Sequence, residues 1–259
     1  MCALKCLATF KAAKAVTWGH QRTINMILLR SNNFSTDEIK GKDKKLPRFE
    51  GERNALGEMH GKGKYFFENA ARYEGDFKFN DIEGWGKLII PTFQEGVYED
   101  KVRYEGGFKR GKFHGMGTFY FVGGGVYEGG YNYGKMEGRG VFTMKNGDQY
   151  EGGFRNSKKE GYGIYIFKES GDMYEGEWKS NEKNGKGVYK FAEGIYEGNF
   201  FNGQFDGHGK LIYLDGSIYE GEFVNGLRHG KGVFKDKEGK ILFDGIWKDG
   251  KEAMEQVKF

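Results

Sequence analysis

Five histidines are the side chains of this sequence best suited to metal binding or proton transfer: His20, His60, His114, His208 and His229. A metal site requires several such ligands within about 2.1 Å of one ion. Three of the five, His60, His114 and His229, immediately precede a Gly-x-Gly motif, each in a different copy of a repeated unit. Even His208 and His229, which belong to adjacent copies, would have their backbones about 10 Å apart. We therefore expect turn or surface histidines and no metal site.

Seven glutamates recur at one per repeat and could supply carboxylates for acid–base chemistry: Glu74, Glu105, Glu128, Glu151, Glu175, Glu197 and Glu220. A catalytic carboxylate pair needs closer spacing than one per hairpin. Lysines such as Lys186, Lys190, Lys231 and Lys235 fall on the same predicted face, so cross-strand ion pairs are expected. Gly-x-Gly suggests a nucleotide loop only where a helix follows, and none is predicted here. We predict a non-enzymatic protein with no catalytic, cofactor-binding or metal-binding residues, no cofactor and no small-molecule substrate.

These residues belong to a repeat that occupies most of the 259-residue chain. Each of seven Tyr-Glu-Gly tripeptides is followed by Gly-x-Gly, and the tyrosine and the first glycine of that motif are always 11 residues apart. The repeat spacing is 22 to 24 residues, except for 31 between Tyr73 and Tyr104. A fixed short period of this kind is typical of a repeat architecture.

Alternation within each repeat predicts the faces of its strands. In Tyr104-Glu105-Gly106-Gly107-Phe108, the period of two places the tyrosine, Gly106 and Phe108 on one face and the glutamate on the other. Regular glycines in a strand allow another group to approach the backbone, and we expect that group to be an aromatic ring. The rings would form an exposed aromatic stripe flanked by a groove, which could hold a partner helix or an extended peptide. The candidate partner-binding aromatic face is Tyr104, Phe108, Tyr127, Tyr131, Tyr150, Phe154, Tyr174, Trp178, Tyr196, Phe200, Tyr219 and Phe223.

Turn dipeptides predict that each repeat is a β-hairpin. Asn202-Gly203, Asn225-Gly226 and Asp249-Gly250 fall between first and second strands, where positive φ is favoured. The fold class is therefore all-β, an elongated single-layer antiparallel sheet of about eight tandem hairpins with a helical or disordered N-terminal extension. We divide the chain into a basic extension (1–48), a repeat array (49–250) and a tail (251–259). Residues 91–103 are an insertion that forms either a long loop or a bulged strand extension.

Composition and charge narrow the class of protein. Residues 1–48 carry ten Lys or Arg against three Asp or Glu, so the remaining chain sums to about −3 out of the total of +4. The array is therefore not expected to bind nucleic acid. The two cysteines, Cys2 and Cys6, lie outside it and favour an intracellular setting. No stretch of 18 apolar residues is present.

The repeat pattern resembles the MORN (membrane occupation and recognition nexus) repeat family over roughly residues 49–250. Tyr174-Glu175-Gly176-Glu177-Trp178 with Gly185-Lys186-Gly187 is close to the family pattern. The resemblance implies an antiparallel sheet of successive hairpins. It further implies a scaffold or binding platform, often in cilia and flagella, at cytoskeletal structures or at membrane junctions.

The first 36 residues contain no Asp or Glu and include Lys5, Lys11, Lys14, Arg22 and Arg30. This composition is typical of a mitochondrial transit peptide, and also of a segment that docks on an assembly or an anionic membrane. Acylation of Cys2 and Cys6 is a third interpretation. Our leading hypothesis is a scaffold subunit that binds protein partners in a ciliary or cytoskeletal assembly. The alternatives are an accessory subunit of a mitochondrial complex and a membrane-lipid adaptor, with direct membrane binding not favoured by the charge of the array.

Overall fold

The computed structural model describes residues 47–68, 70–94 and 97–253. The predicted helical or disordered extension, the possible transit peptide and both cysteines lie outside this part of the chain. The described residues form 18 strands: β1 (Arg48–Arg53), β2 (Met59–Phe66), β3 (Arg72–Lys78), β4 (Asp81–Gln94), β5 (Val97–Lys109), β6 (Lys112–Tyr120), β7 (Val126–Asn132), β8 (Lys135–Thr143), β9 (Gln149–Arg155), β10 (Lys158–Ile166), β11 (Met173–Lys179), β12 (Glu182–Phe191), β13 (Gly194–Phe201), β14 (Gln204–Tyr213), β15 (Ile218–Val224), β16 (Leu227–Lys235), β17 (Ile241–Lys248) and β18 (Lys251–Glu252).

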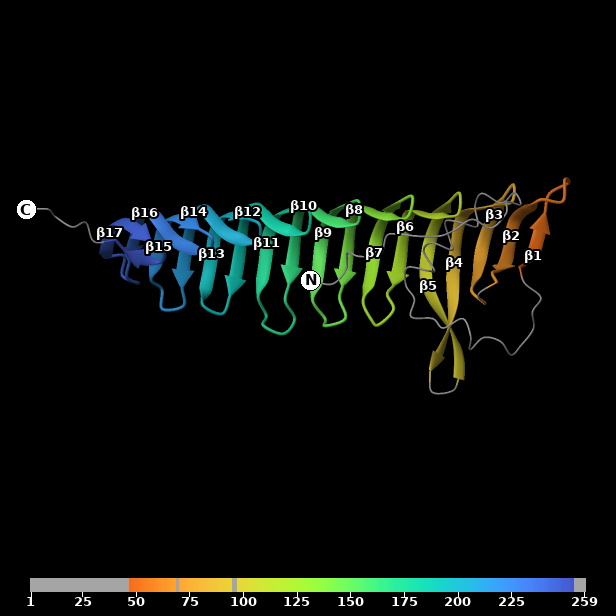
Figure 1. Cartoon of the computed structure of the whole chain (residues 1–259), viewed down its shortest axis with the longest axis horizontal. Helices are drawn as coiled ribbons and strands as arrows, with labels where there is room; N and C mark the ends of the chain where they lie inside the picture. The colour runs from red at the N-terminus through yellow and green to blue at the C-terminus, as the bar shows by residue number, and fades with distance from the viewer. Residues whose placement is uncertain (1–46, 69, 95–96, 254–259) are drawn as a thin grey trace, which may run out of the picture.

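Every strand pairs antiparallel with the strands before and after it, from β1 to β18. The result is one open, elongated sheet whose strands run across its long axis (Figure 1). Eight full hairpins are followed by β17 and the two-residue β18. The predicted all-β sheet of tandem hairpins is confirmed.

A continuous row of paired glycines crosses the sheet from β1 to β17. Each Tyr-Glu-Gly glycine pairs with the second glycine of a Gly-x-Gly on both neighbouring strands, as Gly152 does with Gly140 and Gly163. The register therefore aligns the two motifs, which lie far apart within each repeat of the sequence. This row provides the flat backbone on which the tyrosine rings lie.

The tyrosine of each repeat lies over two glycines of the row. A Cβ built on Gly163 would be 2.5 Å from the Tyr150 Oη, and one on Gly152 would be equally close to the same oxygen. The Tyr150 hydroxyl donates to the Gly153 carbonyl oxygen at 3.0 Å. All seven intact repeats make this bond, at 2.8 to 3.1 Å. The predicted packing of rings on glycine is confirmed, and the hydroxyl explains why tyrosine stands here rather than phenylalanine.

The first glycine of each Gly-x-Gly has a different role, because it bends the second strand. Gly115, Gly138 and Gly161 have φ of 75°, 79° and 75°, a left-handed region that favours glycine. The strand register shifts beside each of them, as expected for a β-bulge. Positive φ also occurs at the predicted turn dipeptides Asn202-Gly203 and Asn225-Gly226. The bend lets the two strands of a hairpin enclose the tyrosine ring.

The insertion at residues 91–103 is a strand extension rather than a loop. It lengthens β4 and β5 to 14 and 13 residues, and their ends project beyond the neighbouring strands (Figure 1). A register shift between Leu88 and Ile89 lies at the base of the projection. The structure thus decides between the two alternatives that the sequence left open.

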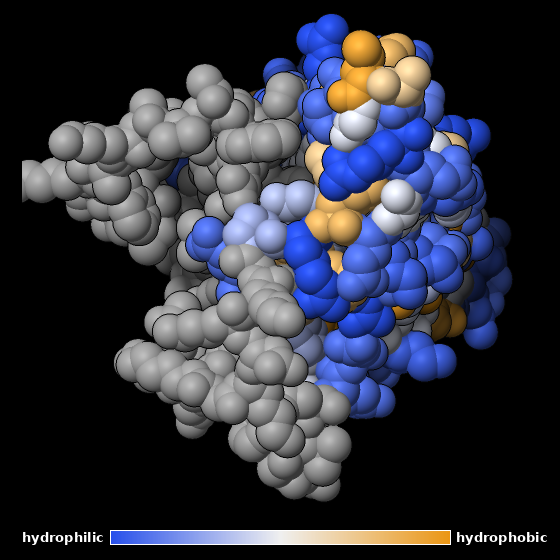
Figure 2. All heavy atoms as spheres, turned by 90° about the vertical axis from the view of Figure 1, so that its right-hand side faces the viewer, coloured by the Kyte–Doolittle hydropathy of each residue, from blue (hydrophilic) through white to orange (hydrophobic). Residues whose placement is uncertain are grey.

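The end of the sheet at β1 has a mostly hydrophilic described surface, with hydrophobic residues in small groups (Figure 2). No helix in residues 47–68, 70–94 and 97–253 is long and apolar enough to cross a membrane.

Candidate functional site

The ring face is defined as the sheet face that carries the tyrosine of each Tyr-Glu-Gly. Most of its aromatic side chains are buried against one another. All twelve residues of the predicted aromatic face are buried, with exposed fractions of 0 to 7%. The expectation that they form an exposed stripe is therefore wrong. They form instead the core of a sheet that no second layer covers within residues 47–68, 70–94 and 97–253, and binding of a partner over them remains a prediction.

The buried rings contact one another edge to face. Tyr150 lies between Phe154 and Trp178, with ring centroids 5.1 and 5.2 Å apart. The same arrangement recurs at Tyr174 and Tyr196. Burial raises the pKa of the Tyr127 hydroxyl to about 12, so these groups are neutral donors. The ring face is thus a continuous stabilising ladder, with each repeat packed on the next.

Three cations cover rings in the second half of the ring face. The Nζ of Lys159 is 3.9 Å from the ring centroid of Trp178, and Lys183 and Arg228 hold similar positions over Tyr189 and Trp247. The corresponding residues of earlier repeats are apolar, as at Met136. Burial lowers the pKa of the Lys159 ammonium to about 8. These cations therefore make cation–π contacts with rings at one side of the ring packing.

The back face, defined as the face that carries the glutamate of each Tyr-Glu-Gly, is open. Toward the beginning of the array its glutamates have cationic partners: Glu74 with Lys64 and Arg72, at 3.4 and 2.7 Å, and Glu105 with Lys87 at 3.0 Å. The expected cross-strand ion pairs therefore exist in this region. For Lys186, Lys190, Lys231 and Lys235, the lysines that suggested such pairs in the sequence, the described residues show no ion pair.

The glutamates at the centre of the array have different neighbours. Glu128 is paired in register with Thr118 and Val141, and Glu151 with Val141 and Ile164. Both carboxylates are exposed. Within the described part of the chain, no cation or hydrogen-bond donor contacts either of them. Among the described residues, the carboxylates of Glu128 and Glu151 therefore lie at the centre of the back face without an ion-pair partner.

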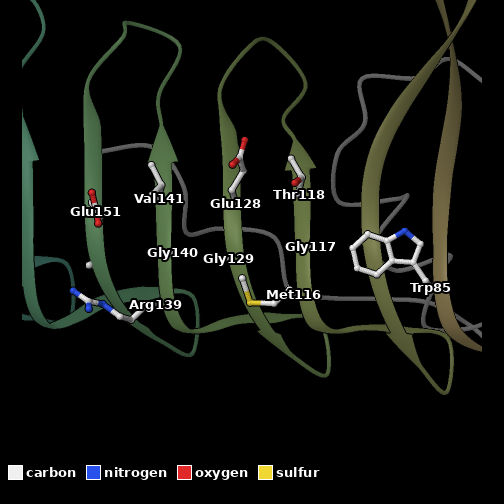
Figure 3. Close-up of a pocket in the computed structure, with 11 residues that line it drawn as sticks. Trp85, Met116, Gly117, Thr118, Glu128, Gly129, Arg139, Gly140, Val141 and Glu151 are labelled. Atoms are coloured by element: carbon white, nitrogen blue, oxygen red, sulfur yellow. The ribbon is translucent and has the colours of Figure 1, made fainter.

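Beside these carboxylates, three exposed apolar side chains occupy the middle position of Gly-x-Gly. They are Trp85, Met116 and Tyr162, with exposed fractions of 52, 63 and 57%. The first two line a shallow groove of about 510 Å³ over β4 to β9, here called the central groove. Figure 3 shows Thr118, Glu128, Val141 and Glu151 in one row, with Met116 and Arg139 nearer the bend.

Sequence reasoning missed this groove. The available signal is the middle residue of Gly-x-Gly, which period two places opposite the rings. In the other repeats that residue is lysine, arginine or histidine: Lys62, Arg139, Lys186, His208 and Lys231. An apolar side chain at an outward position is thus the exception in this chain.

The bends of the central hairpins also differ from those of their neighbours. At the third position after the tyrosine, the central hairpins have Gly107, Gly130 and Gly153, where a Cβ would lie 2.1 to 2.2 Å from a carbonyl oxygen across the hairpin. Flanking hairpins have a polar side chain there. Glu177, for example, accepts a hydrogen bond from the Lys186 backbone N–H at 3.0 Å. The central bends are therefore closed by backbone contact rather than by a side chain.

The four histidines in the described residues are dispersed along the array. His60 and His114 pack against Phe79 and Tyr133, and His229 lies 3.8 Å from the Asp249 carboxylate. Residues 47–68, 70–94 and 97–253 contain no group of three or more His, Cys, Asp or Glu placed to hold a metal ion.

One solved structure, the E1021V mutant of the TCP10 domain of Danio rerio CPAP, is similar over 76% of this chain and 93% of that chain. The identity is 14% and the TM-score is 0.25. No curated protein sequence matches the chain.

The chain matches the MORN repeat family over residues 56–71, 104–126, 127–149, 150–171, 174–195, 196–218 and 219–240. The stretch 72–103, between the first and second matches, contains β3, β4 and the first part of β5, and its Tyr73 is buried on glycine like the tyrosines of the six matches that follow. These matches cover more than half of the sequence. The MORN repeat is a non-enzymatic module that mediates protein or membrane interactions, and this chain belongs to the MORN repeat family.

Proposed function

We propose that the protein is a non-enzymatic scaffold that binds protein partners along the back face of its sheet, as a subunit of a larger assembly. The observation that carries this proposal is the central groove, where two unpaired carboxylates lie beside exposed Trp85 and Met116. Exposed aromatic and methionine side chains are enriched where proteins bind one another. The uninterrupted sheet holds these groups at fixed distances from one another.

Binding over the ring face is the weaker of two sites. Its twelve predicted residues are buried, so a partner could reach only partly buried rings in or just after the second strands, such as Phe121, Phe142 and Phe167. These rings already pack against the core. The back face requires no rearrangement before a partner binds.

A ciliary or cytoskeletal assembly is the proposed setting, supported by the resemblance to the repeat family. A mitochondrial complex is the alternative supported by the acid-free basic start of the chain. Tagging the protein at its C-terminus and sequencing the N-terminus of the recovered product separates the two settings. A mature protein beginning near residue 31 in mitochondria would contradict the ciliary or cytoskeletal setting.

Cross-linking mass spectrometry in native extract tests the scaffold proposal. We expect inter-protein cross-links from lysines beside the central groove, such as Lys87, and a loss of partner when Trp85 and Met116 are changed to serine. Recovery of the same partner with this double variant would contradict the back-face site. Salt-sensitive flotation of the full chain with acidic vesicles would instead favour the lipid-adaptor alternative.

A further inference from the structure

We infer that the central groove binds a basic peptide segment with two Lys or Arg side chains about 10 Å apart and an apolar residue beside them. This inference rests on the proposed scaffold function and specifies the chemistry of the partner. Its basis is the strand register, in which no lysine is paired with Glu128 or Glu151, whereas lysines are paired with Glu74, Glu197 and Glu220.

The register shows why these two carboxylates are free. Glu74 lies between Lys64 and Lys87, while Glu197 and Glu220 lie on either side of Lys210. At the centre of the sheet, those lysine positions are occupied by Thr118, Val141 and Ile164. At each of these positions the lysine found beside Glu74, Glu197 and Glu220 is missing, and the side chain present adds apolar surface to the floor of the groove. A partner that brings cations and apolar side chains complements both changes.

Strand spacing sets the spacing of the charges in the partner. Glu128 is on β7 and Glu151 is on β9, so one strand separates them and their backbones are about 10 Å apart. In the polyproline II conformation a chain rises about 3.1 Å per residue with three residues per turn, so residues i and i+3 lie on the same side about 9 Å apart. A peptide that crosses the strands therefore presents cations at positions i and i+3, with its apolar residue beyond the first cation and toward Trp85 and Met116.

Arg139 allows a test of whether the charge of the groove determines which peptide binds. It is exposed, lines the groove with the two glutamates, and has no ion pair within the described residues. Its positive charge opposes a basic partner and favours an acidic one. Removal of that charge should strengthen the binding of a basic peptide.

A second shallow groove over β10 to β15 provides the matched control. Glu175, Glu197 and Glu220 line it together with Lys186 and Lys210. Each groove lining has one more glutamate than it has Lys or Arg, but the arrangement differs: Lys210 is paired in register with both Glu197 and Glu220, whereas no cation is paired in register with Glu128 or Glu151. Glutamate substitutions there should change peptide binding little.

The test is fluorescence anisotropy with the full-length protein and a labelled twelve-residue Gly-Ser peptide that carries one leucine and two lysines three positions apart. We expect the double variant Glu128→Gln and Glu151→Gln to weaken binding roughly tenfold, since each exposed ion pair contributes a few-fold. Arg139→Gln should tighten it roughly twofold. Glu197→Gln with Glu220→Gln should leave it unchanged, and added salt should weaken it.

Several outcomes would overturn the inference: equal binding by the Glu128/Glu151 variant, tighter binding of a peptide with glutamates in place of lysines, or weaker binding by Arg139→Gln. Displacement of the probe by a synthetic peptide of residues 1–36 would identify a segment of the same chain as the occupant and overturn the assignment to a partner. If no charged peptide binds, but back-face cross-links to a partner persist in extract, the scaffold function survives and the inference fails.

Discussion

The central hairpins β5–β6, β7–β8 and β9–β10 form the same bend as their neighbours with different chemistry. In the flanking repeats, Asp76 and Glu177 accept hydrogen bonds from backbone N–H groups of the bend, and lysines accompany the glutamate row. In the central repeats, glycine closes the bend, and Glu128 and Glu151 lack cations. The comparison indicates that the packing rule is common to all repeats, whereas the surface chemistry is specific to the centre.

The largest expected effect tests what the two regions share. Gly163→Val in the centre and Gly187→Val in the flank each place a side chain where Tyr150 or Tyr174 lies, at 2.5 to 2.8 Å from the ring atoms. Each should lower the free energy of unfolding by about 3 kcal/mol or more, as measured by thermal unfolding. The neighbouring substitution Tyr162→Val, at an exposed position, is the control. Unchanged stability of either glycine variant would contradict the packing of rings on glycine.

Exchanging the bend residues should separate the two regions. Gly153→Glu introduces a Cβ about 2.2 Å from the Glu160 carbonyl oxygen and should cost about 2 kcal/mol. Glu177→Gly removes one hydrogen-bond acceptor from the Lys186 N–H and should cost about 1 kcal/mol. Chemical denaturation of both variants measures the difference. Equal costs would mean that the two bends do not differ as described.

Removing a tyrosine hydroxyl should have the same effect in both regions. Tyr150→Phe leaves the Gly153 carbonyl oxygen without its donor, and Tyr174→Phe does so for the Glu177 carbonyl oxygen. Each should lower the free energy of unfolding by about 1 kcal/mol, again measured by chemical denaturation. A loss at only one of these sites would show that the hydroxyl bond is not a common property of the repeats.

Neutralising glutamates should affect the flank only. Glu74→Gln removes the negative charge that pairs with Lys64 and Arg72, at a cost of about 0.5 kcal/mol; the hydrogen bond from Arg72 holds the pKa of the Glu74 carboxyl below its usual range. Glu128→Gln loses no partner and should not destabilise the protein. A shift of the unfolding midpoint for Glu128→Gln as large as that for Glu74→Gln would show that Glu128 is not free.

A pH dependence of stability is expected at the edge of the centre. Folding lowers the pKa of Lys159 from 10.5 to about 8, so the folded state binds fewer protons and stability rises with pH between about 8 and 10. Folding raises the pKa of the buried tyrosines above 10, which removes stability at higher pH. The difference in unfolding midpoint between the wild type and Lys159→Met cancels the tyrosine contribution. A difference that is flat from pH 8 to 10 would contradict this account of Lys159.

The sequence predicts much of the fold because the motif spacing within the repeat determines the strand register. The constant distance between Tyr-Glu-Gly and Gly-x-Gly is sufficient to place Tyr150 over Gly163. The spacing does not distinguish the roles of Gly161 and Gly163, because a strand bend and a position under a tyrosine ring both require glycine. The sequence also places the rings on one face without showing that a bent single sheet buries them completely.

The central groove could not be predicted in the same way. Its floor depends on which side chains are neighbours across strands, and Val141 is separated from Glu128 and Glu151 in the sequence but paired with both. The absence of a lysine at that position becomes visible only after the strands are aligned. The groove is therefore a property of pairing rather than of any one motif.

The central claim is that partners bind the centre of the back face, and site-specific photo-cross-linking tests it most directly. A photoreactive side chain is placed in the full-length protein at residue 116, which lines the central groove, or at residue 142 on the ring face. We expect the dilysine peptide to cross-link at residue 116, with less product when Glu128 and Glu151 are changed to glutamine. Cross-linking at residue 142 instead, or equal yields with and without the two carboxylates, would contradict the claim.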